Sequence, residues 1–161
     1  MVIDIFAFGA LPSVTITAAT NSGERFNVQP DEQVIIKGEL VYIKSKWVVV
    51  SCQGILTNKR LALGKNLNPV LGFIPRLYSY FRGKKIVFQI LLQNLEAITH
   101  QDKSELFTLK TTDGSEYSVM STSLFGKKKN DWLQAITAAG QNAQPDRRAV
   151  VNVDSVEFRA T

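Results

Sequence analysis

Apolar and polar residues alternate along most of this chain, a pattern that is typical of β-strands. The run from Trp47 to Cys52 is nearly all apolar and β-branched, so we expect a buried strand there. Gly38 lies inside another such run, where a glycine often marks a bulge or a bend. Strand-like runs are expected at 14–17, 25–28, 33–43, 47–52, 54–63 and 86–92.

A hairpin is predicted around Asp113-Gly114, a pair of residues that favours a tight turn between antiparallel strands. The flanking strands cover 105–112 and 115–120. Their period of two puts four apolar side chains on one face. These side chains are Phe107, Leu109, Tyr117 and Val119.

One amphipathic helix follows the strands. Asp131 is a candidate N-cap, with Gln134 three residues later, and Gly140 is placed to end the helix. An earlier start, around Leu124, stays open. Its apolar stripe consists of Trp132, Leu133, Ile136 and Ala139. A single helix after a series of antiparallel strands can close the open end of a bent sheet.

Several segments resemble the GRAM-type domains, which belong to the pleckstrin-homology-like (PH-like) group. The segments are 31–39 (DEQVIIKGE), 54–61 (GILTNKRL), 92–98, 107–117 and 131–133. The resemblance implies a mainly β fold, α+β by count: a PH-like bent antiparallel β-barrel of about seven strands, capped by one C-terminal α-helix. It also implies a binding scaffold, since such domains commonly bind phosphoinositides, other lipids or proteins.

The resemblance divides the chain into three parts. Residues 1–30 form an N-terminal strand or hairpin extension, and 31–140 form the PH/GRAM-like domain with an insertion at about 64–85. Residues 141–161 form a C-terminal tail with weak strand character. Asp4, Gly9 and Pro12 interrupt the apolar start of the chain, so neither a secretory signal nor a membrane span is expected there.

Residues that carry chemistry are sparse. The chain has one cysteine, Cys52, and one histidine, His100. No zinc-ligand spacing, phosphate-binding glycine loop or nucleophile motif is present in the sequence. We therefore expect no enzyme activity, no cofactor and no metal, and only a deep pocket lined by His100 and carboxylates would argue otherwise.

Positive charge is concentrated in one segment of the chain. The formal net charge is +5, and no Asp or Glu occurs from Leu40 to Lys85. Such a segment predicts one electropositive face. The candidate ligand-binding residues are Lys44, Lys46, Lys59, Arg60, Arg76, Arg82, Lys84 and Lys85.

The insertion also carries apolar and aromatic residues between its cations. The candidate membrane or partner contacts are Phe73, Ile74, Leu77, Tyr78, Tyr80 and Phe81. Three roles stay open for them: a lid packed on the sheet, a contact with a protein or a second subunit, and a contact with lipid head groups.

Together these patterns predict a non-catalytic binding module. Its expected role is protein interaction or assembly, through a protein partner or self-association. The alternative is peripheral binding to an anionic membrane surface, through phosphoinositide-like head groups on a basic and aromatic face. Nucleic acid is not an expected partner, because the aromatic residues crowd one loop. The expected location is cytoplasmic, either free or at the membrane periphery.

Overall fold

The computed structural model describes residues 26–65, 85–122 and 128–161. Its strands are β1 (Val34–Ser45), β2 (Val48–Thr57), β3 (Arg60–Lys65), β4 (Ile86–Leu91), β5 (Leu95–His100), β6 (Leu106–Thr111), β7 (Glu116–Ser121), β8 (Arg147–Val151) and β9 (Ser155–Ala160). A short 3-10 turn, η2 (Leu92–Asn94), joins β4 to β5, and the helix is α2 (Lys129–Ala143). The strand expected at 14–17 and residues 66–84 of the insertion lie outside the described residues. The strand expected at 25–28 is wrong for its described part, because residues 26–28 form no strand.

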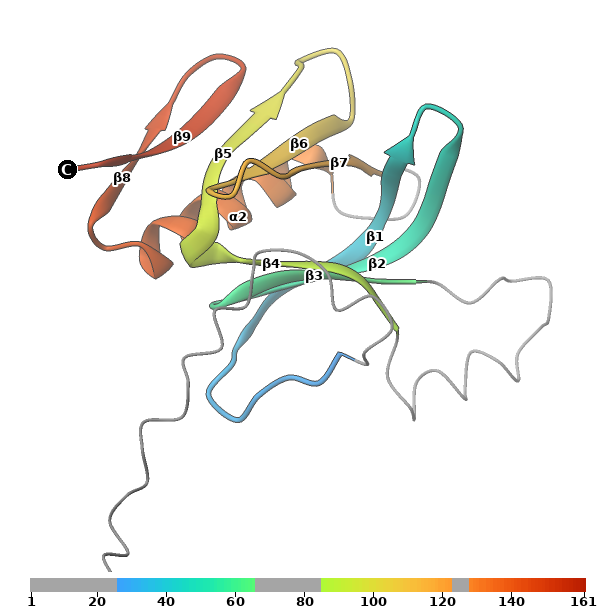
Figure 1. The fold of residues 1–161 in the computed structure, drawn as a ribbon, viewed down its shortest axis with the longest axis horizontal. Helices are drawn as coiled ribbons and strands as arrows, with labels where there is room; N and C mark the ends of the chain where they lie inside the picture. The colour runs from blue at the N-terminus through green and yellow to red at the C-terminus, as the bar shows by residue number, and fades with distance from the viewer. Residues whose placement is uncertain (1–25, 66–84, 123–127) are drawn as a thin grey trace, which may run out of the picture.

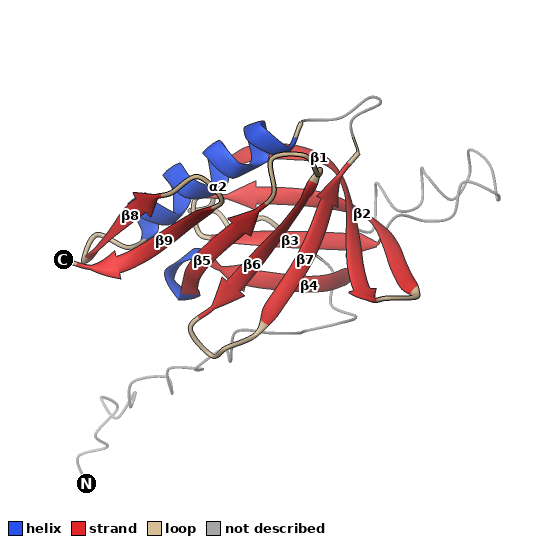
Figure 2. Ribbon diagram, turned by 90° about the horizontal axis from the view of Figure 1, so that it is seen from above, coloured by secondary structure: helices blue, strands red, loops and turns tan. Residues whose placement is uncertain are grey.

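The nine strands form one antiparallel sheet in the order β4-β3-β2-β1-β7-β6-β5-β9-β8. The sheet is bent, so that β3 and β4 run across β5, β6 and β7 (Figure 1). Helix α2 lies along one end of this bent sheet (Figure 2). The expected fold class is confirmed, with nine strands in place of about seven. Within the described residues the sheet does not close, since β4 and β8 remain as its two edges.

The helix supplies the centre of the core. All four residues of the predicted stripe are buried, and Trp132 has no exposed surface. Gly54 lets the indole approach β2. A Cβ at Gly54 would lie 2.5 Å from Leu40 Cδ1 and 2.9 Å from Trp132 Cη2. Any larger residue would force the packed side chains apart.

The predicted N-cap at Asp131 and the predicted stop at Gly140 are wrong. The helix begins at Lys129, and Asp131 lies in its first turn, where its carboxylate accepts a hydrogen bond of 3.0 Å from the Lys128 N–H. The helix also continues past Gly140 to Ala143. Gly140 gives room to the ring of Phe158, which would lie 2.7 Å from a Cβ at that position. Packing between α2 and β9, rather than chain termination, therefore explains this glycine.

The predicted β6–β7 hairpin is confirmed. Gly114 has φ +83°, a conformation that glycine adopts at little cost. Lys110 pairs with Glu116 across the turn. The four apolar side chains assigned to one face are all buried.

The C-terminal segment contributes two strands to the sheet. Strand β9 pairs with β5, and β8 pairs with β9. Gln141, in the last turn of α2, covers the outer edge of β8: its Nε2 donates to Arg147 O and its Oε1 accepts from the Ala149 N–H, both at 2.6 Å. Val156 and Phe158 of β9 are buried and attach this hairpin to the core.

Two expectations for β1 and β2 are wrong. Trp47 is 87% exposed and Val49 is 64% exposed, although a buried strand was predicted there. Among the described residues, β2 pairs with β3 only from Cys52 onward, because Lys65 opposite Cys52 is the last described residue of β3, so no described strand lies beside residues 48–51 on that side. Gly38 pairs with Gly54 in regular register, and the register shifts of this strand pair lie near its two ends.

Candidate binding sites at the two ends of the sheet

The turn between β1 and β2 carries an exposed mixture of basic, aromatic and aliphatic side chains. We call residues Lys44 to Val49 the hairpin tip. Lys44 and Lys46 are exposed, and the Lys46 ammonium lies 5.6 Å from the centroid of the Trp47 ring. Val48 is 46% exposed beside it. The tip therefore presents two cations followed by an indole and two valines.

Two further lysines lie at the same end of the sheet. The Lys65 N–H donates to Lys85 O at 2.9 Å, and both side chains are exposed. Lys65 pairs with Cys52 of β2, four residues from the start of that strand. The structure thus groups Lys85 and the unpredicted Lys65 near the tip. Outside the described residues lie Arg76, Arg82, Lys84, Phe73, Ile74, Leu77, Tyr78, Tyr80 and Phe81.

Lys59 and Arg60 lie at the opposite end of β2, away from the hairpin tip, and both are paired with acids. Arg60 Nε donates to Glu32 Oε1 at 2.7 Å, and Arg60 Nη2 donates to Glu32 Oε2 at 2.9 Å. The guanidinium also lies 4.6 Å from the centroid of the Phe26 ring. Lys59 forms an exposed ion pair with Asp31. These contacts attach the segment before β1 to the β2–β3 turn, so Arg60 has a structural role here.

Glu32 is ionised in spite of its burial. Burial raises the pKa of this carboxyl, but hydrogen bonds from Arg60, from the Gln29 N–H and from the Thr57 hydroxyl outweigh that effect and hold its pKa below the ordinary range. The Arg60–Glu32 pair is therefore charged at neutral pH.

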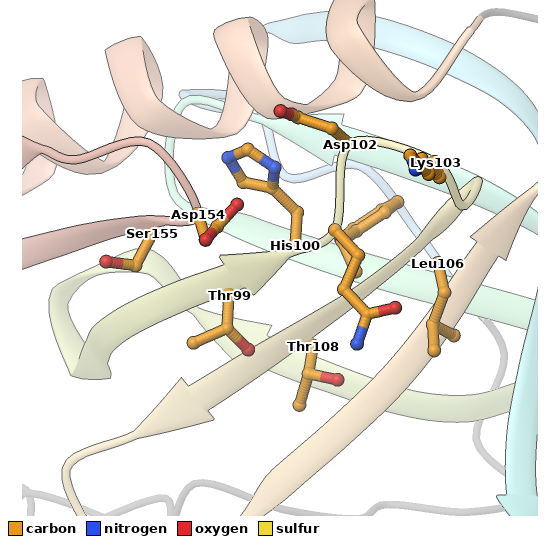
Figure 3. Close-up of a pocket in the computed structure, with 10 residues that line it drawn as sticks. Thr99, His100, Asp102, Lys103, Leu106, Thr108, Asp154 and Ser155 are labelled. Carbon is orange, nitrogen blue, oxygen red and sulfur yellow. The ribbon is translucent and has the colours of Figure 1, made fainter.

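An open groove of about 600 Å³ lies beside His100, at the end of β5 (Figure 3). We call it the β5–β9 groove. Its walls come from the end of β5, the start of β9, the loop before β6 and the start of β6, and they include Thr99, Asp102 and Asp154. The His100 Nδ1 is buried and has no hydrogen-bond partner among the described residues.

This groove has part of the arrangement that would argue for an enzyme, because it combines His100 with two carboxylates. It is wide open to solvent, however, and does not shield a reaction from water. The described parts of the chain contain no group of three His, Cys, Asp or Glu residues that could hold a metal ion. Sequence reasoning missed Asp154 as a groove residue, since only the pairing of β9 with β5 brings it to His100.

Alternation of strand direction separates the groove from the hairpin tip. Strands β1, β7, β6 and β5 are neighbours and each runs antiparallel to the next. The end of β5 therefore lies opposite the end of β1. One molecule has two candidate sites that do not overlap.

Solved structures with a similar fold are known over about 70% of this chain. The DH/PH domains of PDZ-RhoGEF in complex with GTP-γ-S-activated RhoA match with a TM-score of 0.52 and 16% identity, over 70% of this chain and 31% of that one. The linker-DH/PH domains of p115-RhoGEF match with a TM-score of 0.50 and 12% identity, over 68% and 29%. The fold of this chain is PH-like. At 12–16% sequence identity, the similarity of the PH-like chain to these two RhoGEF structures concerns the fold alone. The chain spans about a third of the length of either one.

Sequence comparisons do not assign the PH-like chain to a protein family. No protein-family model matches the chain, and no curated protein is significantly similar to it. In the described parts of the PH-like chain, no helix has both the length and the apolar composition to cross a bilayer.

Proposed function

We propose that this chain is a non-catalytic binding module that attaches to an anionic membrane surface through the hairpin tip. The exposed Trp47 between Lys46 and Val48 carries this proposal. Tryptophan is enriched at the interface between lipid and water, and lysines near an anionic leaflet each contribute about 1 kcal/mol of attraction. The GRAM-like segments at 31–39 and 54–61 support an assignment to that type within the PH-like group.

The lysines around the tip support an anionic surface. Lys44, Lys46, Lys65 and Lys85 are exposed at this end of the sheet. Within the described residues, none of these four lysines takes part in an ion pair. Their charge is therefore available to lipid head groups.

Vesicle binding tests this proposal. The full chain is expected to bind vesicles of phosphatidylcholine with phosphatidylserine more tightly than vesicles of phosphatidylcholine alone, and the preference should fall with added salt. Replacing both Lys44 and Lys46 with glutamine should weaken binding about 30-fold, because about 2 kcal/mol of attraction is lost. Co-sedimentation measures both effects.

The matched control replaces two exposed lysines elsewhere, Lys37→Gln and Lys103→Gln, which leaves the net charge equal to that of the tip variant. Its binding should stay near that of the wild type. Equal losses in the two double variants would show that net charge, rather than the tip, attracts the protein to vesicles. Binding that ignores phosphatidylserine at low salt would refute attachment to an anionic surface.

We also propose a protein contact at the same tip as the second candidate, including a contact with a second copy of the chain. The apolar surface of Trp47, Val48 and Val49 supports it, because exposed aromatic residues are common in the centres of protein interfaces. Light scattering on the full chain tests self-association. A dimer that becomes monomeric in Trp47→Ala would support it, and a dimer unaffected by that substitution would exclude the tip as the interface.

A further inference from the structure

The β5–β9 groove exists because the C-terminal hairpin adds β9 to the edge of β5. Thr99 pairs with Ser155, and the His100 N–H donates to Asp154 O at 2.9 Å. This pairing holds Asp154 and Ser155 against the loop that follows β5. The resulting volume of about 600 Å³ is in the range typical of sites for small ligands or single side chains.

Polar groups in this groove lack partners. In the part of the chain that the structure describes, the carboxylates of Asp102 and Asp154 take part in no ion pair and no side-chain hydrogen bond. The buried Nδ1 of His100 is also without a partner there. Most buried polar atoms in folded proteins have a hydrogen-bond partner, so an exception of this kind needs an explanation. A bound ligand that donates hydrogen bonds provides one.

The charge of the groove differs in sign from that of the whole chain. Asp102 and Asp154 contribute two negative charges and Lys103 one positive charge, so these three side chains are net negative, whereas the chain carries +5. A cationic group fits this setting. Guanidinium and ammonium groups form strong, charge-assisted hydrogen bonds with carboxylates.

Two exposed apolar side chains lie close to Asp154 in the sequence. Val151 is 69% exposed and Val153 is 78% exposed, at the turn that leads directly into Asp154. A free inorganic cation or a small polyamine would make no use of these valines. An extended peptide that places an apolar residue beside a basic one would contact both features.

We propose that the β5–β9 groove binds an arginine or lysine side chain in an extended basic and apolar segment of a partner protein. Asp102 and Asp154 receive the cation, and Val151 and Val153 contact its apolar neighbour. This goes beyond attachment through the hairpin tip. Because the two sites lie at opposite ends of the strands, the same molecule can hold a membrane surface and this partner together.

Nuclear magnetic resonance of the 15N-labelled full chain tests the proposal. The probe is the blocked tetrapeptide valine-arginine-valine-threonine, and its twin carries uncharged citrulline in place of arginine. The arginine peptide should shift the amide signals of residues 99–103 and 153–155, and the citrulline peptide should bind about tenfold more weakly, since a charge-assisted contact of about 1.4 kcal/mol is lost.

Two variants locate the site. Asp102 and Asp154 are exposed, so Asp102→Asn with Asp154→Asn should keep the fold and weaken peptide binding by about tenfold or more. Asp146→Asn, at another exposed aspartate, should bind as the wild type does. Vesicle binding by the double variant should be unchanged, which separates this site from the hairpin tip.

Three results would overturn the proposal. Equal binding of the citrulline peptide would remove the cation as the recognised group. Unchanged affinity in the double variant would remove the two carboxylates. Spermidine that competes with the peptide at equal concentration would show that the valines contribute nothing.

Discussion

Replacing Trp132 with alanine is expected to lower the free energy of unfolding by about 3–5 kcal/mol, the usual cost of removing a large buried aromatic side chain. The indole has no exposed surface and lies against Gly54 and Leu40, so the neighbouring backbone cannot easily close the space. Urea unfolding followed by circular dichroism measures the change.

Two variants serve as controls for this result. Trp132→Phe should cost clearly less, because a buried aromatic ring remains. The indole N–H that this substitution removes has no partner among the described residues. Trp47→Ala should change stability by about 0.5 kcal/mol or less, since surface substitutions rarely do more and Trp47 is 87% exposed. Similar losses at both tryptophans would contradict the placement of α2 against the sheet.

Replacing Arg60 with methionine is expected to destabilise the protein by about 3 kcal/mol, at the lower end of the cost of leaving a buried charge without its partner. The Glu32 side chain is 1% exposed and that of Arg60 is 13% exposed, so water can replace little of the lost interaction. Thermal or urea unfolding at neutral pH measures the difference from the wild type.

The control for this variant is the neighbouring exposed ion pair. Lys59→Met removes the partner of Asp31, where the two side chains are 42% and 67% exposed, and should cost far less than Arg60→Met because water screens this pair. Equal losses of unfolding free energy in Lys59→Met and Arg60→Met would show that burial does not make the Arg60–Glu32 pair more stabilising than the Lys59–Asp31 pair.

Acid should reduce the effect of Arg60→Met. The pKa of Glu32 is lower in the folded chain than its ordinary value of 4.5, so the unfolded chain binds more protons as the pH falls below that value. The stability that the ion pair provides is present above this pH and is lost as the pH falls through the folded pKa. The difference between variant and wild type should therefore shrink in acid.

Local chemistry was sufficient to predict the elements that depend on a few neighbouring residues. Asp113-Gly114 predicted its hairpin because Gly114 takes a positive φ that few residues adopt. The stripe around Trp132 predicted the buried face of α2 because helical periodicity fixes which residues point to one side. The C-terminal end of the helix was predicted wrongly because Gly140 packs against Phe158, which lies 18 positions away in the sequence.

The binding sites depend on pairing over long distances, which a pattern along the chain does not contain. An apolar run such as Val48–Val50 predicts burial only if other strands flank it, and among the described residues β3 ends at Lys65, opposite Cys52. Arg60 was predicted as a ligand-binding cation, whereas β1 pairing brings Glu32 to it. Asp31 and Glu32 before the strand were the one local sign that the cations of the β2–β3 turn would be paired.

The side chain of Gln141 has a consequence for assembly of the protein. A bare outer strand can recruit another chain by continuing the ladder of main-chain hydrogen bonds, which is the first step of fibril growth. The amide of Gln141 already occupies Arg147 O and the Ala149 N–H, the positions that an incoming strand would need. Addition of a strand at this part of β8 would first require the Gln141 amide to leave, so open-ended growth from this edge is discouraged.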